Sequence, residues 1–368
     1  MRREFAAALA RVTAGRGVEK EDVVMLLTAQ PGEEEEALYR QADAFRARYV
    51  GEEVHLRGVI EFSNYCRRRC HYCGLRADNH TLDRYRMAPE EILTAARRGV
   101  ELGYKTIVLQ SGEDPWYTAE VLAETVAAIK ELGVAVTLCV GERPRQEYEL
   151  WRRAGADRYL LKHETANPEL YARLHPDMSW EKRLACLRWL KELGYQVGSG
   201  NMVGLPGQTL EDLAADILLL RELEVEMAGI GPFIPHPNTP LGDHPAGSLD
   251  LTYRVLAVTR LVVPWAHLPA TTAVGTLSPI GRQMALRRGA NVVMPNLTPG
   301  KYRPNYQIYP GKICINEEPD DCRHCLEGMI RSLGRVVARH PGHGLRRSPP
   351  TKNWKPRIRV EVSKLLQS

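Results

Sequence analysis

The sequence is short of cysteine and of long apolar runs. Only eight of its 368 residues are Cys, and six of these lie in two tight triplets, which argues against the disulfide framework of a small secreted protein. No stretch approaches the roughly 18 to 20 apolar residues that a membrane span requires. The apolar run at residues 5–10 is too short for a signal peptide, and acidic residues follow it. We therefore expect a protein of the reducing cytoplasm with no membrane segment.

Charge is unevenly distributed along the chain. The net charge is +5, but the stretch 335–368 holds nine Lys or Arg residues and a single acid, Glu361. Four prolines in this stretch favour a solvated basic tail, which can also dock an acidic protein partner. No aromatic-rich binding module accompanies the tail, so nucleic-acid binding is disfavoured.

A helix, a glycine and a short apolar run recur along the chain. Glycine closes helices because it tolerates a left-handed conformation, and the helix-ending glycines are Gly103, Gly133, Gly155, Gly194 and Gly289. The apolar runs predict strands at 54–62, 104–110, 134–140, 156–162, 195–203, 226–233, 268–274 and 290–295. The helical patterns between them include 89–102, 118–132, 179–193, 209–223 and 278–288.

Alternating strands and helices imply a parallel sheet, so the chain belongs to the α/β class. Eight such units predict a closed (β/α)8 TIM barrel, with an open doubly wound sheet as the alternative. Residues 1–50 predict two helices joined near residues 28–36, ahead of a barrel at 51–310. Residues 311–368 form a C-terminal extension.

Polar loops follow the strands, at the end where parallel α/β folds place their active sites. The first loop places Cys66, Cys70 and Cys73 at the spacing C-x3-C-x2-C. A structural zinc site takes four ligands in closed geometry, whereas thiolates hold the irons of a 4Fe-4S cluster. Three cysteines leave one iron open, and that iron can take the amino and carboxylate groups of S-adenosylmethionine (SAM). The loop therefore indicates a catalytic cluster with bound SAM rather than zinc.

The spacing C-x3-C-x-aromatic-C, with Tyr72 before the last cysteine, resembles the signature of radical SAM enzymes. The resemblance implies that Tyr72 lies on the adenine side of SAM. The stretch SGED at 111–114 resembles the loop that holds the methionine amino group of SAM. The further SAM contacts that the resemblance implies are Ser111, Gly112, Glu113, Glu164, Arg183 and Met202.

Most of the chain, from about Val54 to Arg335, resembles HydE-type maturases of FeFe-hydrogenase, relatives of biotin synthase and methylornithine synthase. The stretches that carry this resemblance are IEFSNYCRRRCHYCGLRADN, TIVLQSGEDPWY, GADRYLLKHETANPELY, MVGLPGQT, GIGPFIPHPNTPL, PATTAVGT and YQIYPGKIC. It implies reductive cleavage of SAM to a 5′-deoxyadenosyl radical. The radical would act on a small anionic iron–cysteine complex bearing carbon monoxide and cyanide, during assembly of the hydrogenase H-cluster. An electron donor such as flavodoxin or ferredoxin, and other hydrogenase maturases, are the implied partners.

A second triplet, Cys314, Cys322 and Cys325, has the spacing C-x7-C-x2-C. In the family that the chain resembles, these positions can hold an auxiliary 2Fe-2S or 4Fe-4S cluster that the reaction does not need. Three reduced thiols are the alternative. The isolated Cys139 and Cys186 are expected to be small buried hydrophobic residues.

The resemblance also places an anionic, carboxylate-bearing substrate inside the barrel. Its implied contacts are Arg158, Lys162, Thr271, Thr272, Tyr306 and Tyr309, with ordinary interior polar groups as the alternative. Two rival functions stay open at this point. A methylornithine synthase-like mutase acting on lysine has no evident use for the second triplet, and an iron–sulfur scaffold would bind a cluster without cleaving SAM. Biotin synthase is disfavoured because no interior cysteine set for its sulfur-donating cluster is found.

Overall fold

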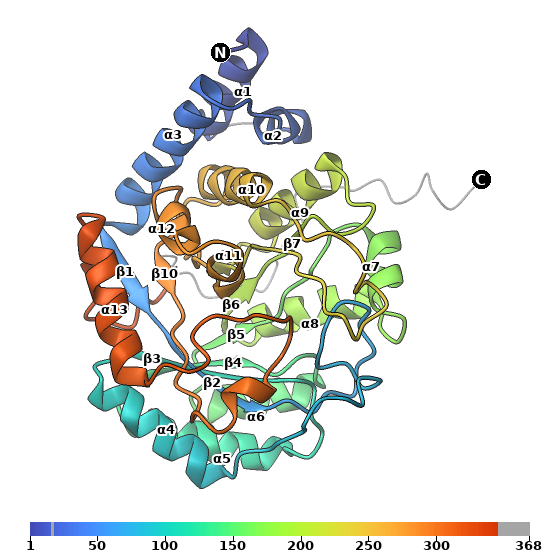
Figure 1. The fold of residues 1–368 in the computed structure, drawn as a ribbon, viewed down its shortest axis with the longest axis vertical. Coiled ribbons are helices and arrows are strands. Elements are labelled where there is room, and N and C mark those ends of the chain that lie inside the picture. The colour runs from blue at the N-terminus through green and yellow to red at the C-terminus, as the bar shows by residue number, and fades with distance from the viewer. Residues whose placement is uncertain (16–17, 345–368) are drawn as a thin grey trace.

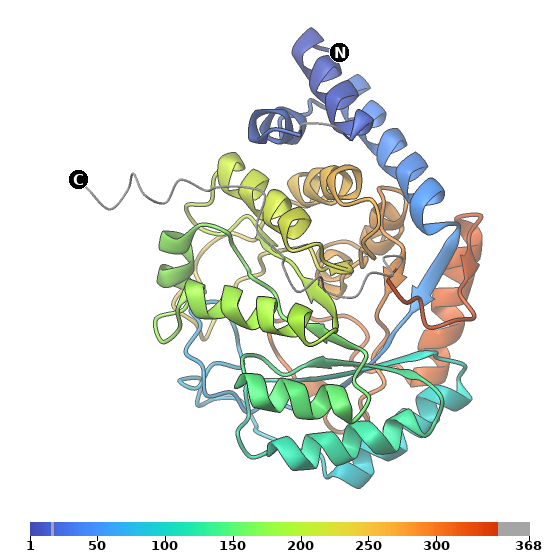
Figure 2. The same ribbon diagram turned by 180° about the vertical axis from the view of Figure 1, so that it is seen from behind.

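The computed structural model describes residues 1–15 and 18–344 (Figures 1 and 2). Its strands are β1 (Glu53–Leu56), β2 (Gly58–Ser63), β3 (Thr106–Ser111), β4 (Ala135–Cys139), β5 (Arg158–Leu160), β6 (Gln196–Ser199), β7 (Met202–Val203), β8 (Met227–Ala228), β9 (Gly231–Pro232), β10 (Val292–Val293) and β11 (Val336–Val337). Its helices are α1 (Arg3–Ala14), α2 (Lys20–Leu27), α3 (Glu33–Val50), α4 (Pro89–Glu101), α5 (Ala119–Lys130), α6 (Arg145–Arg153), α7 (Pro168–Leu174), α8 (Trp180–Glu192), α9 (Leu210–Glu222), α10 (Leu249–Val262), α11 (Thr272–Leu277), α12 (Gly281–Leu286), the 3₁₀-helix η1 (Arg303–Asn305) and α13 (Pro319–Ser332).

Parallel strands close into a barrel at the centre of the structure. The order β2-β3-β4-β5-β6-β8 forms most of the wall. Three isolated parallel bridges continue the pairing past β8 and back to β2, and they join Met227 to His267, Pro269 to Val292 and Val59 to Asn296. The predicted (β/α)8 barrel is therefore confirmed, and the open sheet is wrong.

Helices cover the outside of the barrel, as Figure 1 shows for α4, α5 and α6. In β3, Ile107, Val108 and Leu109 are all buried, which is typical of parallel strands that are covered on both faces. All five helix-ending glycines named above have φ between 74° and 108°. The sequence pattern of helix, glycine and strand thus corresponds to the repeating unit of the barrel.

The predicted strand at 268–274 is partly wrong. Only His267 and Pro269 make bridges, and α11 begins at Thr272. The β-branched run favoured a strand, but this segment packs as a helix against β9. The predicted helix at 278–288 is likewise shorter, since α12 covers 281–286.

The first 50 residues form three helices rather than the predicted two. Gly15, with φ 73°, ends α1 ahead of α2, a break that the sequence analysis missed. Helix α2 packs against α9, and α3 packs against α10, so this N-terminal layer covers one side of the barrel's helical coat (Figure 1). The boundaries at residues 50 and 310 stay predictions. The basic tail lies mostly at 345–368, outside the described residues.

None of the helices in the described part of the chain is long and apolar enough to cross a membrane.

Helix α4 approaches the barrel closely through Gly99. A Cβ at this position would lie 2.5 Å from Leu297 Cδ1 and 3.0 Å from Ile107 Cδ1, and Leu297 cannot retreat because it also lies over Gly58. We therefore expect Gly99→Ala to lower the free energy of unfolding by about 1–3 kcal/mol through overpacking. Urea denaturation would measure the change.

The matched control for this prediction is Gly328→Ala in α13. Gly328 is exposed and has nothing within 4 Å of an added Cβ. Alanine should therefore stabilise the protein there, by up to about 1 kcal/mol, because it lowers the entropy of the unfolded chain. Stabilisation by both substitutions would contradict the packing argument.

Candidate active site

The first cysteine triplet lies in the loop after β2, at the C-terminal end of the barrel strands. The backbone N–H groups of Arg68 and Glu113 each donate to Cys66 Sγ over 3.4 Å. Gly112, at the end of β3, has no side chain, and a Cβ there would lie 2.7 Å from Cys66 Cβ and 2.3 Å from the Tyr65 carbonyl oxygen. The loop is therefore seated directly on the end of β3.

Glu113 secures this loop through its side chain. Its buried carboxylate accepts from Arg68 Nε at 2.6 Å and Arg67 Nε at 3.3 Å, and also from the Glu142 N–H at 2.7 Å. Glu113 was predicted to contact SAM. The structure places its backbone against Cys66 and its carboxylate among arginines of the cysteine loop, so the side chain positions the loop.

The donor set of this loop fits an iron–sulfur cluster. Burial raises the pKa of Cys66 and raises that of Cys73 to about 12, so the thiolates depend on a bound cation for their charge. Among the described residues, these three Sγ atoms do not form a group within 4.8 Å of one another, the spacing a single ion would use. Three thiols with N–H donors on Cys66 suit a multi-iron cluster better than one metal ion.

A cavity of about 360 Å³ opens beside Cys73. Three of the predicted SAM contacts line it, namely Tyr72, Glu164 and Met202. Tyr72 packs against the small apolar cluster that contains Met202, and its hydroxyl is 3.0 Å from His175 Nε2. This apolar wall suits a flat aromatic base.

Glu164 brings a negative charge to the same wall. It has a left-handed backbone, with φ 66°, and forms an ion pair of 2.9 Å with Lys162. Burial opposes its ionisation, yet the charges of Lys162 and Arg183 hold the pKa of Glu164 below its ordinary value. The carboxylate is therefore charged and faces the cavity as a hydrogen-bond acceptor.

The other predicted SAM contacts lie close by but do not line the cavity. Ser111 is the last residue of β3 and Gly112 follows it, and the Ser111 hydroxyl donates to the Gly112 carbonyl at 2.7 Å. Arg183 is buried, pairs with Glu142 at 2.7 Å and donates to the Lys162 carbonyl. The structure thus keeps Arg183 behind the cavity wall.

Most of the predicted substrate contacts meet in this cavity. Lys162, Thr271, Thr272 and Tyr309 line it. Tyr306 is buried just behind, where its hydroxyl accepts from Gln110 over 3.3 Å.

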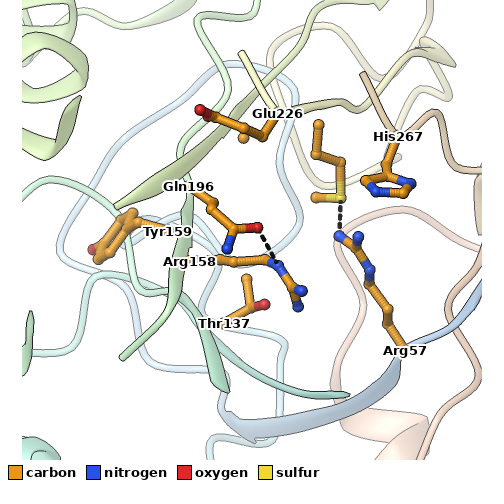
Figure 3. A pocket seen from close by; sticks show the side chains of 9 residues that line it. Arg57, Thr137, Arg158, Tyr159, Gln196, Glu226 and His267 are labelled. Carbon is orange, nitrogen blue, oxygen red and sulfur yellow. Dashed lines mark hydrogen bonds between the residues drawn. The ribbon is translucent and has the colours of Figure 1, made fainter. Parts of the chain in front are cut away.

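Arg158 is a correction, because it does not line the cavity. It lies near the opposite end of the barrel, where it donates to Gln196 (Figure 3). Its guanidinium also donates to the Pro341 carbonyl at 2.8 Å and the Gly342 carbonyl at 3.0 Å. Side chains alternate along a strand, so Arg158 and Lys162 share a face. Four residues nevertheless separate them by about 13 Å along the direction of the strand.

Sequence analysis missed two cations of the cavity, Arg282 and Lys312. Lys312 forms an ion pair with Glu61, as Lys162 does with Glu164. Arg282 instead donates to Thr272 Oγ1 at 3.4 Å and to Cys314 Sγ at 3.8 Å. Within residues 18–344 no carboxylate pairs with it. Arg282 comes from α12, and no sequence motif marked it.

The second cysteine triplet reaches the same cavity through Cys314. A hydrogen bond from the Cys322 thiol lowers the pKa of Cys314 below its ordinary value, with help from Arg282. Cys325 lies one helical turn beyond Cys322 on α13 and is exposed. The thiols of Cys314 and Cys322 are therefore in contact, and the exposed thiol of Cys325 could bind a metal at the surface. Of the isolated cysteines, Cys186 is fully buried as expected and Cys139 is partly buried.

Comparison with known proteins identifies relatives of this chain. Residues 60–220 match the radical SAM superfamily. The chain is 58% identical over 307 residues to the [FeFe] hydrogenase maturase subunit HydE of Thermotoga maritima, covering 83% of this chain and 88% of that protein. It is 30% identical over 342 residues to 3-methylornithine synthase of Methanosarcina acetivorans, covering 92% and 93%.

Solved structures share the fold. The crystal structure of methylornithine synthase (PylB) superposes with a TM-score of 0.78 at 26% identity, covering 90% of this chain and 97% of that one. The maturase HydG superposes with a TM-score of 0.78 at 18% identity, covering 91% and 76%, and it supports the barrel alone. A closed barrel with three thiols beside its mouth thus defines a radical SAM enzyme. Within that class, the chain belongs to the HydE family.

The close contact between Gly112 and the cysteine loop can be tested directly. Gly112→Ala should push the loop away from β3, because the new Cβ would meet the Tyr65 carbonyl at 2.3 Å. We expect loss of the first cluster with the fold retained. Iron and sulfide content, measured after anaerobic reconstitution in a Cys322→Ala background, isolates that cluster.

Gly300→Ala is the control for this variant, since nothing lies within 4 Å of its added Cβ. It should keep full iron content. An unchanged iron content in Gly112→Ala would show that cluster binding does not depend on the close contact between Gly112 and the cysteine loop.

Proposed function

We propose that this enzyme reductively cleaves SAM and uses the resulting radical on a small anionic iron–cysteine complex bearing carbon monoxide and cyanide. The reaction would serve assembly of the FeFe-hydrogenase H-cluster. One observation carries the proposal: a single cavity is bordered by Cys73 and Tyr72 as well as by Arg282 and Thr271. The 58% identity to a hydrogenase maturase subunit HydE supports a role in H-cluster assembly.

Cys66, Cys70 and Cys73 would hold the 4Fe-4S cluster. When bound, that cluster supplies the electron that cleaves SAM to a 5′-deoxyadenosyl radical. The chain's own part is to bind and orient SAM. Tyr72 and Met202 offer an apolar wall for the adenine, and the charged Glu164 offers an acceptor for hydroxyl or ammonium groups.

Arg282 and Thr271 would bind the carboxylate of the substrate. Arg282 is the cavity cation that no carboxylate of residues 18–344 neutralises, and the buried Thr271 hydroxyl has no hydrogen-bond partner there. Charged hydrogen bonds of this kind are the strong ones, and a guanidinium matches carboxylate geometry. The remaining wall is largely apolar, which excludes water from the reacting atoms.

The second triplet supports the maturase over the mutase. Cys314 lines the cavity, and the Cys322 thiol forms a hydrogen bond with Cys314. An auxiliary 2Fe-2S or 4Fe-4S cluster on these thiols would therefore lie next to the proposed substrate site. A lysine mutase has no use for such a cluster. Flavodoxin or ferredoxin would deliver the electron. The enzyme would work in the cytoplasm beside other hydrogenase maturases.

The two triplets should differ sharply in their effect on activity. Cys70→Ala removes one of three cluster ligands, so 5′-deoxyadenosine formation and hydrogenase activation should both fall to background. Cys322→Ala should leave most of both. Product chromatography with reduced, reconstituted protein and SAM measures the first, and an in vitro hydrogenase activation assay measures the second.

Three outcomes would contradict parts of this proposal. Equal collapse of both variants would refute an auxiliary role for the second triplet. Intact cluster without 5′-deoxyadenosine would favour an iron–sulfur scaffold. Methylornithine formed from lysine and SAM would favour the mutase.

Arg282→Gln tests the anion site. Loss of a charged hydrogen bond costs about 1.5–3 kcal/mol, so the substrate concentration for half-maximal hydrogenase activation should rise roughly 10- to 150-fold. Cleavage of SAM without substrate should be unchanged. Arg287→Gln, an exposed position next to the same helix, is the control. Equal effects of both variants would place the carboxylate elsewhere.

A further inference from the structure

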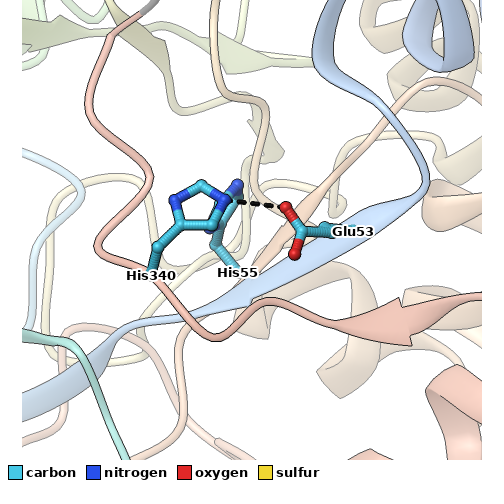
Figure 4. A group of neighbouring side chains, drawn as sticks. All are labelled: Glu53, His55 and His340. Atoms are coloured by element: carbon cyan, nitrogen blue, oxygen red, sulfur yellow. Dashed lines mark hydrogen bonds and ion pairs between the residues drawn. The ribbon is translucent and has the colours of Figure 1, made fainter.

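Three potential metal ligands converge away from the cavity, where β1 meets the C-terminal segment of the chain. They are Glu53 and His55 of β1 and His340, which follows β11 (Figure 4). Their ligand atoms all lie within 4.8 Å of one another. The function proposed above uses none of them.

The backbone builds this cluster. Strands β1 and β11 are parallel neighbours, with Glu53 opposite Val336, and the Ala338 N–H continues the pairing to the Val54 carbonyl at 3.0 Å. Glu53 and His55 are two residues apart on one strand, so their side chains share a face. The chain then carries His340 across that face. Strand pairing thus holds Glu53 and His55, and His340 lies in the bend that follows β11.

Burial divides the cluster into an inner and an outer part. Glu53 and His340 have side chains that are 39% and 57% exposed, and His340 Nε2 donates to Glu53 over 2.7 Å. His55 is only 4% exposed, and its Nδ1 has no hydrogen-bond partner in residues 18–344. An ion pair between the outer two residues does not account for His55. An unpaired buried polar atom costs about 1–3 kcal/mol, so the inner histidine needs another partner.

We propose that Glu53, His55 and His340 bind a divalent zinc-class cation. Two imidazoles and one carboxylate form a ligand set that suits Zn²⁺, with the fourth position open to water from the exposed side. The site is distinct from both cysteine triplets, whose thiols suit iron clusters. It would fasten the segment after β11 to the first strand of the barrel.

This fastening has a structural context. Beyond His340, the carbonyl of Gly342 accepts from Arg57 at 3.2 Å and from Arg158 at 3.0 Å, inside the barrel. Figure 3 shows these two arginines side by side in the barrel. The segment thus covers the end of the barrel opposite the active site. A cation at His340 would hold that cover in place at its outer edge.

Metal binding changes one hydrogen bond nearby. The Gly342 N–H donates to His340 Nδ1 at 3.1 Å, so the ring carries its proton on Nε2 when no metal is bound. A cation at Nε2 moves that proton to Nδ1, and the Gly342 N–H must then find another acceptor. Local backbone adjustment at residues 341–342 therefore accompanies binding.

The test uses cluster-loaded enzyme under anaerobic conditions, so that iron occupies the cysteines. Zn²⁺ is titrated by equilibrium dialysis, and the bound ion is examined by X-ray absorption. We expect one added Zn²⁺ per chain with a shell of nitrogen and oxygen only. His340→Ala and Glu53→Gln should each weaken binding by at least about 10- to 100-fold.

His244→Ala is the matched control, because His244 is an exposed histidine outside the cluster. It should bind Zn²⁺ as the unmodified protein does. The proposal is overturned by absence of zinc binding, by sulfur in the zinc shell, or by equal affinities for unmodified protein and His340→Ala. Both test variants change exposed or half-exposed side chains, and their melting temperatures show whether the fold is kept.

Discussion

The seat of the cysteine loop on the end of β3 is the contact on which the site depends. Gly112 allows the loop to touch the strand, and Glu113 binds two arginines of that loop while its N–H reaches Cys66. Gly112 and Glu113 thus together fix the backbone of the cysteine loop, the two arginines of that loop and the Cys66 thiol. A cluster held in this way has a defined position relative to the barrel mouth, and so does anything bound to it. The barrel holds the loop in place, and the loop carries the cysteines that would bind the cluster.

The charges of the cavity are nearly balanced, and this shapes what it can accept. Lys162 and Lys312 each have a carboxylate partner, whereas Arg282 has none in the described part of the chain. The lining therefore carries three cations against two carboxylates, before any thiolate or cofactor is counted. A singly charged anion would neutralise this excess of one positive charge. A doubly charged one would leave excess negative charge in a mostly apolar space, which is costly.

Much of the fold could be predicted from the sequence because its repeating unit has strong local signals. The glycines that end helices, such as Gly103 and Gly194, take the left-handed conformation for which glycine is favoured, and apolar runs became strands. The errors arose where local preference and packing disagree. The β-branched residues at 271–274 favour a strand, yet α11 forms there, and the turn at Gly15 lacked a proline to mark it.

The candidate site was predictable where a motif fixes the chemistry and not where only the fold does. Cys73, Tyr72 and Lys162 were found by spacing or resemblance, and they meet at one cavity. Arg158 was misplaced because the resemblance assigned it together with Lys162 on the same strand, and a shared strand does not give the depth of a residue along the barrel. Arg282 was missed because its helix brings it to the cavity only through tertiary packing.

Strand β1 has a consequence for how the chain matures. It lies between β10 and β11, so both of its edges find partners only after residues 292–293 and 336–337 have been made. During synthesis on the ribosome, both edges of this early strand stay unpaired, although β2 can already pair with β3. Long-range pairing of this kind slows folding and invites association between unfinished chains. The last part of the barrel to be translated is therefore the part that shields its first strand.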